Sequence, residues 1–155
     1  MSNPDVVTLP STLMGLLMPL GDRTLLLPQV AMAELIGYRP AKAVHAAPGW
    51  YLGELEWRDL RLPLIGFEAA SGGEVKASDR SRIAIINAQG GRSDVKFLGL
   101  VLQGIPRSIR LDQSLARADV DLAPFELSAA MIAGDVARIP DLMALEKALE
   151  DAGLI

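Results

Sequence analysis

The chain has 155 residues, half of them hydrophobic, with a formal net charge of −4 and a pI near 5.0. This composition supports one ordinary domain or two small joined lobes, and it argues against extensive disorder. Nucleic acid is a poor candidate partner because the chain is acidic and has no basic cluster. The absence of cysteine excludes disulfides, thiolate metal sites and a cysteine nucleophile.

The N-terminal residues predict a lead-in to the fold. Residues 1–11 contain two prolines and little periodicity, so we expect a flexible segment before a single domain over 12–155. They lack the basic flank and the apolar run of a signal peptide. Apolar stretches such as 30–33 are too short to cross a bilayer. We therefore expect a cytoplasmic protein without direct membrane insertion.

Short apolar runs separated by turn residues follow this segment. They are typical of short strands, although runs of this length also occur in helices. The predicted elements are, in order, a strand over 13–20, a turn at Gly21-Asp22, a strand over 24–27, one helical turn over 28–33, a strand over 34–38 and a connector over 41–47. The first two strands predict a hairpin that is buried on both faces.

The most informative stretch is APGWYLGELEWRDLRLPLIGF, residues 47–67, which holds four of the seven aromatic residues. Apolar and polar residues alternate over 53–58 and again over 60–65, which predicts two strands with one buried face. A two-residue turn at Arg58-Asp59 predicts three facing pairs, namely Trp57 with Leu60, Leu55 with Leu62, and Glu56 with Arg61. The hydrophobic pattern and the charge pattern thus agree on one register. Pro63 cannot donate a backbone hydrogen bond, so we expect an edge strand or a bulge there.

The second half contains further strand and turn signals. The stretch EAASGGEVKASDR over 68–80 is the best candidate boundary, because it is small, polar and Gly-rich. The predicted elements beyond it are strands over 82–87, 97–102 and 105–111, a loop or weak helix over 112–122, a hairpin of 131–133 and 136–139 that turns at Gly134-Asp135, and a closing helix with Leu142, Leu145 and Leu149 on one face. About ten short strands without strand–helix–strand alternation predict a mainly all-β fold of small barrels.

No catalytic or metal-binding pattern is present. His45 is the only histidine, no GxSxG elbow accompanies it, and a structural histidine is the better interpretation. Glu54 and Glu56 share a strand face and could mimic a glycosidase pair, but a solvated face is favoured. Asp119 and Asp121 lack the loop spacing of a calcium site. We expect no enzyme activity, no cofactor and no metal. Strands that are apolar on both sides indicate either enclosure or a surface reserved for a partner.

The pattern resembles the CheW-like chemotaxis coupling proteins. The resemblance rests on PQVAMAELIGY (28–38), on APGWYLGELEWRDLRLPLIGFE (47–68), on SRIAIINAQ (81–89), on FLGLVLQGIPRSI (97–109), and on the Gly134-Asp135 turn with its helix. Within that family, LLLPQVAMAELIGYRP and GWYLGELEWR are most similar to ChpC-type coupling proteins of the chemosensory system that controls type IV pili and twitching motility. The family pattern covers nearly the whole chain.

The resemblance implies two intertwined five-stranded β-barrels with a C-terminal helix and a hydrophobic core between them. It implies an adaptor that joins the cytoplasmic tip of a methyl-accepting receptor to the regulatory domain of a histidine kinase. The receptor-facing residues that it implies are Met32, Glu34, Gly53 and Arg58. Approximate subdomains would span 22–80 and 12–21 together with 81–155.

Each implied site residue also has a purely structural interpretation. Met32 is as readily a core residue, and Glu34 can pair with a neighbouring basic residue such as Arg39. Arg58 can stabilise its own hairpin, and Gly53 can be required by the backbone conformation at its position.

The sequence departs from the family pattern at three positions. Asp59 replaces a glycine, Gly66 replaces a usual aspartate, and Gln103 replaces a frequent acidic residue. Asp59 could bind Arg58 locally and compete with a partner. Two other functions stay open, namely a small-molecule-binding regulatory domain with a pocket between the barrels, and a hydrolase that relies on His45.

Overall fold

The computed structural model describes residues 12–44, 46–112 and 115–155, so the predicted lead-in over 1–11 lies outside the described residues. Ten strands, two α-helices and one 3₁₀ turn make up this part of the chain. They are β1 (Thr12–Pro19), β2 (Thr24–Pro28), η1 (Gln29–Ala31), β3 (Met32–Gly37), β4 (Tyr51–Trp57), β5 (Leu60–Ile65), α1 (Phe67–Ala70), β6 (Arg82–Asn87), β7 (Phe97–Leu102), β8 (Arg107–Asp112), β9 (Glu126–Ile132), β10 (Asp135–Pro140) and α2 (Leu142–Asp151). Within the described ranges, no helix is long and apolar enough to span a bilayer.

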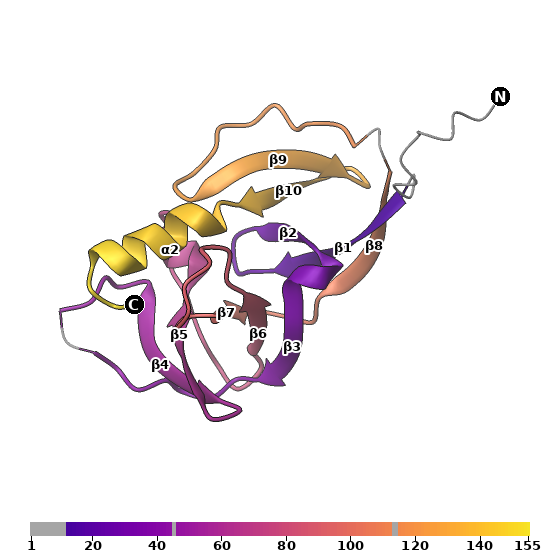
Figure 1. The fold of residues 1–155 in the computed structure, drawn as a ribbon. Helices are drawn as coiled ribbons and strands as arrows, with labels where there is room; N and C mark the ends of the chain where they lie inside the picture. The colour runs from indigo at the N-terminus through magenta and orange to yellow at the C-terminus, as the bar shows by residue number, and fades with distance from the viewer. Residues whose placement is uncertain (1–11, 45, 113–114) are drawn as a thin grey trace, which may run out of the picture.

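The strands form two five-stranded sheets, which confirms the predicted mainly β fold (Figure 1). One sheet has the order β8-β1-β2-β10-β9, and the other has the order β3-β6-β7-β5-β4. The sheets group the strands differently from the predicted subdomain ranges. The strand β2 pairs with β1, while β6 and β7 lie in one sheet with β3, β4 and β5. The chain therefore leaves the first sheet after β2, builds the second sheet completely, and returns.

Each sheet curls until a segment beyond one end strand reaches the opposite end strand. In the second sheet, Lys42 follows β3 and exchanges two backbone hydrogen bonds with Glu54 of β4, at 2.9 and 3.0 Å. In the first sheet, Arg117 follows β8 and forms an isolated bridge with Ala130 of β9. Two of the four sheet ends are thus covered by the chain itself, which limits exposed edge groups.

Three apolar clusters fill the molecule. One lies within each curled sheet, around Leu55, Trp57 and Ile83 in the second and around Leu17 and Leu26 in the first. The largest cluster joins both sheets and α2 through Leu16, Met18, Leu25, Leu27, Ala84, Ile86, Leu98, Leu100, Leu102, Leu142, Leu145 and Leu149. Alternate residues of β6 and β7 point into different clusters because side chains alternate along a strand. Enclosure therefore explains why these strands are apolar on both faces.

The helix α2 forms as its sequence predicts. Asp141 stands before its first turn, and its side chain accepts a hydrogen bond from the backbone N–H of Ala144 at 3.0 Å. This contact satisfies one of the free N–H groups of the helix start. Gly153 follows the helix with a φ of +72°, a conformation that favours glycine. The apolar face of the helix is buried in the largest cluster.

Two buried carboxylates tie distant segments together. Glu126 at the start of β9 accepts hydrogen bonds from Arg23 at 2.9 Å and from Arg138 at 2.8 Å. Glu146 of α2 accepts hydrogen bonds from the backbone of residues 89–90 and from Arg92 at 3.1 Å. Because both carboxylates are buried and hydrogen-bonded, removing either one leaves partly buried donors with fewer acceptors.

Two local predictions differ from the structure. The strand β5 is not an edge strand, since it lies between β4 and β7. Pro63 faces Glu54, whose backbone N–H and C=O both form hydrogen bonds with Lys42. The Glu54–Pro63 pair is therefore not hydrogen-bonded, and the missing N–H of the proline is tolerated there. The second difference concerns the β9–β10 turn, which is centred on Ala133-Gly134, with φ values of +51° and +88°, one residue earlier than expected.

Candidate protein-contact site

The β4–β5 hairpin has the predicted register. Trp57 faces Leu60, Leu55 faces Leu62, and Glu56 faces Arg61. Its turn residues Arg58 and Asp59 have φ values of +48° and +62°. Positive φ at both positions matches the turn type whose twist suits a two-residue hairpin. The tip of the hairpin is thereby fixed, and it holds the Arg58 side chain 69% exposed.

Glu34 joins the two end strands of the second sheet. Its Oε1 accepts a hydrogen bond from the indole N–H of Trp57 at 2.7 Å, and it lies 3.3 Å from a guanidinium nitrogen of Arg58. The guanidinium of Arg58 also stacks over the Trp57 ring, with its carbon 4.9 Å from the ring centroid. The sheet order places β3 and β4 at opposite ends, so these contacts exist because the sheet curls. The structure therefore brings two of the four predicted receptor-facing residues into direct contact.

The ion-pair partners of Glu34 and Arg58 differ from the ones considered from the sequence. Glu34 pairs with Arg58 and not with Arg39, whose guanidinium donates to the backbone carbonyl of Glu56. Arg58 pairs across the sheet end with Glu34, and within the described residues it has no ion pair with Asp59. An ion pair this exposed contributes only about 0–1 kcal/mol. The guanidinium therefore stays accessible to a partner at little cost in stability.

Gly53 occupies a position that requires glycine. It is buried, its φ is +130°, and a Cβ would overlap the carbonyl oxygen of Lys42. The close approach is the Lys42–Glu54 bridge that covers the end of the second sheet. Gly53 is thus required by the backbone, because only glycine allows β4 to approach Lys42 this closely.

Met32 begins β3 and is half-buried against the largest apolar cluster. A register shift in the β3–β6 pairing separates it from Glu34, so these two residues do not follow regular strand alternation. Beside it in the chain, Val30 and Ala31 line an apolar groove of about 480 Å³. This groove lies between the η1 segment on one side and β10 with the start of α2 on the other.

The rim of this groove carries exposed apolar side chains that the sequence analysis did not single out. Val30 is 84% exposed, Leu127 61% and Met143 56%. Each stands next to buried residues in its own element, so single-sequence periodicity does not reveal that the three lie together. The only feature of the sequence that pointed to such a surface was that several strands are apolar on both sides.

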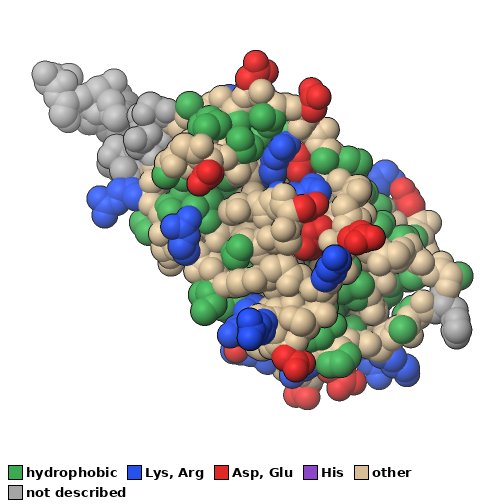
Figure 2. Space-filling model, turned by 180° about the vertical axis from the view of Figure 1, so that it is seen from behind, with side chains coloured by type: hydrophobic (Ala, Val, Ile, Leu, Met, Phe, Trp, Pro, Cys, Tyr) green, Lys and Arg blue, Asp and Glu red, His purple; other side chains and the backbone are tan. Residues whose placement is uncertain are grey.

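No group of three or more His, Asp or Glu side chains in the described part of the molecule is placed to hold a metal ion. His45 lies outside the described residues. Figure 2 shows basic side chains interspersed with acidic ones across one face.

The fold and the site define a small all-β domain of two linked sheets that exposes an arginine-tipped hairpin and an apolar groove. The model of the CheW-like domain matches residues 14–150, and the chain belongs to this family. A solved structure of the scaffolding protein TtCheW from Thermoanaerobacter tengcongensis has the same fold, with a TM-score of 0.72. That match has 19% sequence identity and covers 86% of each chain. No curated protein sequence matches the chain.

Two of the departures from the family pattern have local structural roles. At Gly66 a Cβ would lie 2.8 Å from the side chain of Val75, so the segment after α1 packs directly on this backbone. Gln103 follows β7, and its side-chain oxygen accepts a hydrogen bond from the hydroxyl of Ser81 at 3.0 Å.

Proposed function

We propose that this protein is a non-catalytic adaptor that couples a methyl-accepting chemoreceptor to a chemotaxis-type histidine kinase. The carrying observation is the exposed ion pair between Glu34 of β3 and Arg58 at the tip of the β4–β5 hairpin, within a CheW-like domain. The relative TtCheW is described as a scaffolding protein, which supports a binding role for this chain. The resemblance of residues 25–40 and 49–58 to ChpC-type coupling proteins supports a role for the adaptor in type IV pili and twitching-motility signalling.

The receptor would be bound through charge and apolar contact together. Arg58 presents a planar fork that can take a carboxylate or backbone carbonyls, and it can exchange Glu34 for a partner group. Met32 and the neighbouring groove offer apolar surface to a helical receptor tip, where a flexible thioether adapts well. Gly53 contributes indirectly, because it allows β4 to approach Lys42 and so sets the position of the hairpin.

The mechanism needs no reaction. A domain that holds a receptor and the regulatory domain of a kinase at a fixed relative orientation passes a conformational bias from one to the other. Several weak contacts made at once supply the net affinity. Both partners present their binding regions in the cytoplasm, so we propose that the protein acts there.

The decisive experiment measures binding of the folded protein to a receptor-tip fragment and to a kinase regulatory domain by pull-down and titration. Arg58→Ala should weaken receptor binding about 10-fold or more, since a lost charged hydrogen bond costs about 1.5–3 kcal/mol. Met32→Glu should also weaken it, because it puts a charge into an apolar contact. Circular dichroism should stay native for both variants. Arg61→Ala is the matched control, because Arg61 is an exposed arginine on the next strand of the same hairpin.

The outcomes separate contact from bracing. If Arg58→Ala lowers the unfolding free energy but leaves receptor binding unchanged, the arginine only braces Trp57 and Glu34. A folded wild-type protein that binds neither the receptor nor the kinase would end the proposal.

A further inference from the structure

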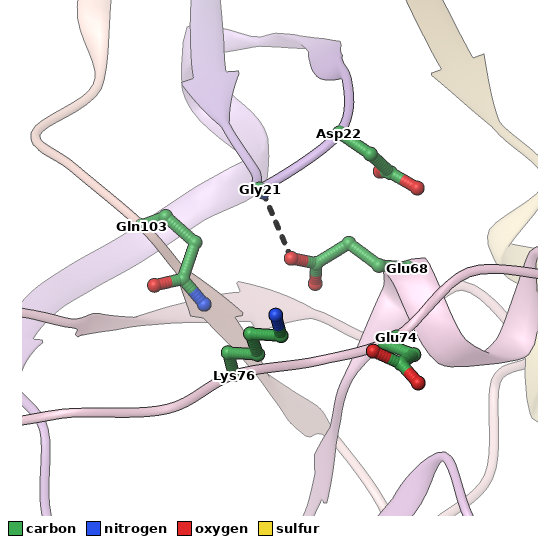
Figure 3. Close-up of a pocket in the computed structure, with 6 residues that line it drawn as sticks. All are labelled: Gly21, Asp22, Glu68, Glu74, Lys76 and Gln103. Carbon is green, nitrogen blue, oxygen red and sulfur yellow. Dashed lines mark hydrogen bonds between the residues drawn. The ribbon is translucent and has the colours of Figure 1, made fainter.

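A second cavity, of about 430 Å³, lies at the junction of the two sheets. Its lining comes from three separate segments, namely the β1–β2 turn, the stretch from α1 towards β6, and the end of β7. Figure 3 shows six of its residues, which are Gly21, Asp22, Glu68, Glu74, Lys76 and Gln103. The volume is within the range of about 300–1,000 Å³ that is typical of small-molecule sites. None of the four predicted receptor-facing residues lines it.

Glu68 supplies a buried acceptor with one free oxygen. The residue is fully buried in α1, and its Oε2 accepts a hydrogen bond from the backbone N–H of Gly21 at 2.9 Å. Its Oε1 is buried and has no hydrogen-bond partner among the described residues. A buried carboxylate oxygen without a partner is costly, so this oxygen is suited to receive a donor.

Gln103 supplies the complementary donor. The hydroxyl of Ser81 already accepts from the backbone N–H of Ser78, so its own O–H donates to the Oε1 of Gln103. This contact fixes the amide with its nitrogen towards the cavity, on the side of Lys76 (Figure 3). The Nε2 is buried and, like Glu68 Oε1, has no partner in the described part of the chain.

Of the other charged groups in the cavity lining, one already has an ion-pair partner and two have none among the described residues. Asp22 is occupied by Arg23, which donates to both of its oxygens at 2.9 Å. Hydrogen bonding from Arg23 lowers the pKa of Asp22, so this carboxylate stays ionised and committed to the arginine. Glu74 and Lys76 are exposed and make no ion pair with other described residues, and Figure 3 shows the Lys76 ammonium between Gln103 and Glu68.

From this arrangement we infer that the cavity binds a small zwitterion of the α-amino acid type. The ligand ammonium donates to Glu68 Oε1, while its carboxylate accepts from Gln103 Nε2 and from the Lys76 ammonium. A simple cation satisfies the glutamate only, and a simple carboxylate satisfies the glutamine and the lysine only. A molecule that carries both groups on one carbon, as an α-amino acid does, can satisfy both unpartnered atoms through charge-assisted hydrogen bonds.

The test is calorimetric titration and thermal-shift measurement of the full chain with glycine, L-alanine, L-serine, L-glutamine and L-arginine. Ethylamine and propionate serve as matched probes, because each carries one of the two charged groups of alanine. At least one amino acid should bind saturably and raise the melting temperature, with an affinity at least about 10-fold above that for either single-group probe.

Variants assign the binding to this cavity. Glu68→Gln keeps the acceptor for Gly21 and removes the charge, so it should weaken binding about 10-fold or more. Lys76→Ala changes an exposed side chain outside the core and should weaken binding several-fold, which keeps the test valid if Glu68→Gln does not fold. Asp79→Asn is the matched control, since Asp79 is exposed in the same segment and does not line the cavity.

Two results would overturn the inference. One is the absence of saturable binding by every amino acid at 10 mM. The other is equal binding of ethylamine and alanine, which would define a simple cation site. Neither result bears on receptor binding by Arg58, so this inference and the proposed function fail separately.

Discussion

Replacing Gly53 by alanine tests whether this glycine is required by the backbone. Alanine at φ +130° carries a backbone strain of about 1–3 kcal/mol. The added Cβ would also lie 2.6 Å from the carbonyl carbon of Lys42, so the Lys42 segment must move away. That movement breaks the two backbone hydrogen bonds with Glu54, each of which contributes about 0.5–1.5 kcal/mol. The expected loss of unfolding free energy is therefore about 2–6 kcal/mol.

The assay is urea unfolding followed by circular dichroism and by the fluorescence of the two tryptophans. With a denaturant slope of about 2 kcal/mol/M, the midpoint should fall by at least about 1 M. Gly37→Ala is the control, because Gly37 lies in β3 of the same sheet and a Cβ there meets nothing within 4 Å. Its effect should stay within about 0.5 kcal/mol. Equal midpoints for the two variants would refute the backbone explanation of Gly53.

Three further substitutions test contacts described above. Trp57→Phe removes the N–H donated to Glu34 together with part of the buried indole, so it should lower the unfolding free energy by at least about 1 kcal/mol, measured in urea; an unchanged midpoint would contradict both contributions. Glu126→Ala removes the counter-charge of Arg138 and one of the two carboxylate partners of Arg23, so it should cost about 3 kcal/mol, and a neutral effect in thermal and urea unfolding would contradict this. The pKa of Asp22 is lowered by the hydrogen bonds from Arg23, so its contribution is present above the unfolded-state pKa of about 3.9 and is lost as pH falls below it. Asp22→Asn should therefore weaken the fall of stability on acidification, and identical acid unfolding curves would argue against it.

Local patterns predicted the parts of the fold that depend on neighbouring residues. The β4–β5 register followed from alternation on both sides of Arg58-Asp59, because hydrophobic and charged positions agreed. The bounds of β6 and β7 and the face of α2 followed from runs of apolar residues with clear ends. These elements carry their own signals of period, turn and cap.

The sequence pattern did not predict contacts that depend on how the sheets curl. Glu34 and Trp57 are distant in the chain and lie at opposite ends of one sheet, so their hydrogen bond follows from the whole strand order. The pairing of β2 with β10, and the grouping of β6 and β7 with β3–β5, depend on contacts between segments far apart in the chain. The cavity around Glu68 and Gln103 brings together three such segments, and no local motif marks it.

The apolar cluster shared by the two sheets has a mechanical consequence. Side chains from β1, β2, β6, β7 and α2 interlock in one close-packed interior, so the sheets cannot slide or rotate against each other without opening voids. A displacement of one sheet should therefore move the other sheet with it. Such coupled movement is useful in a protein that is proposed to transmit a change of orientation between two larger partners.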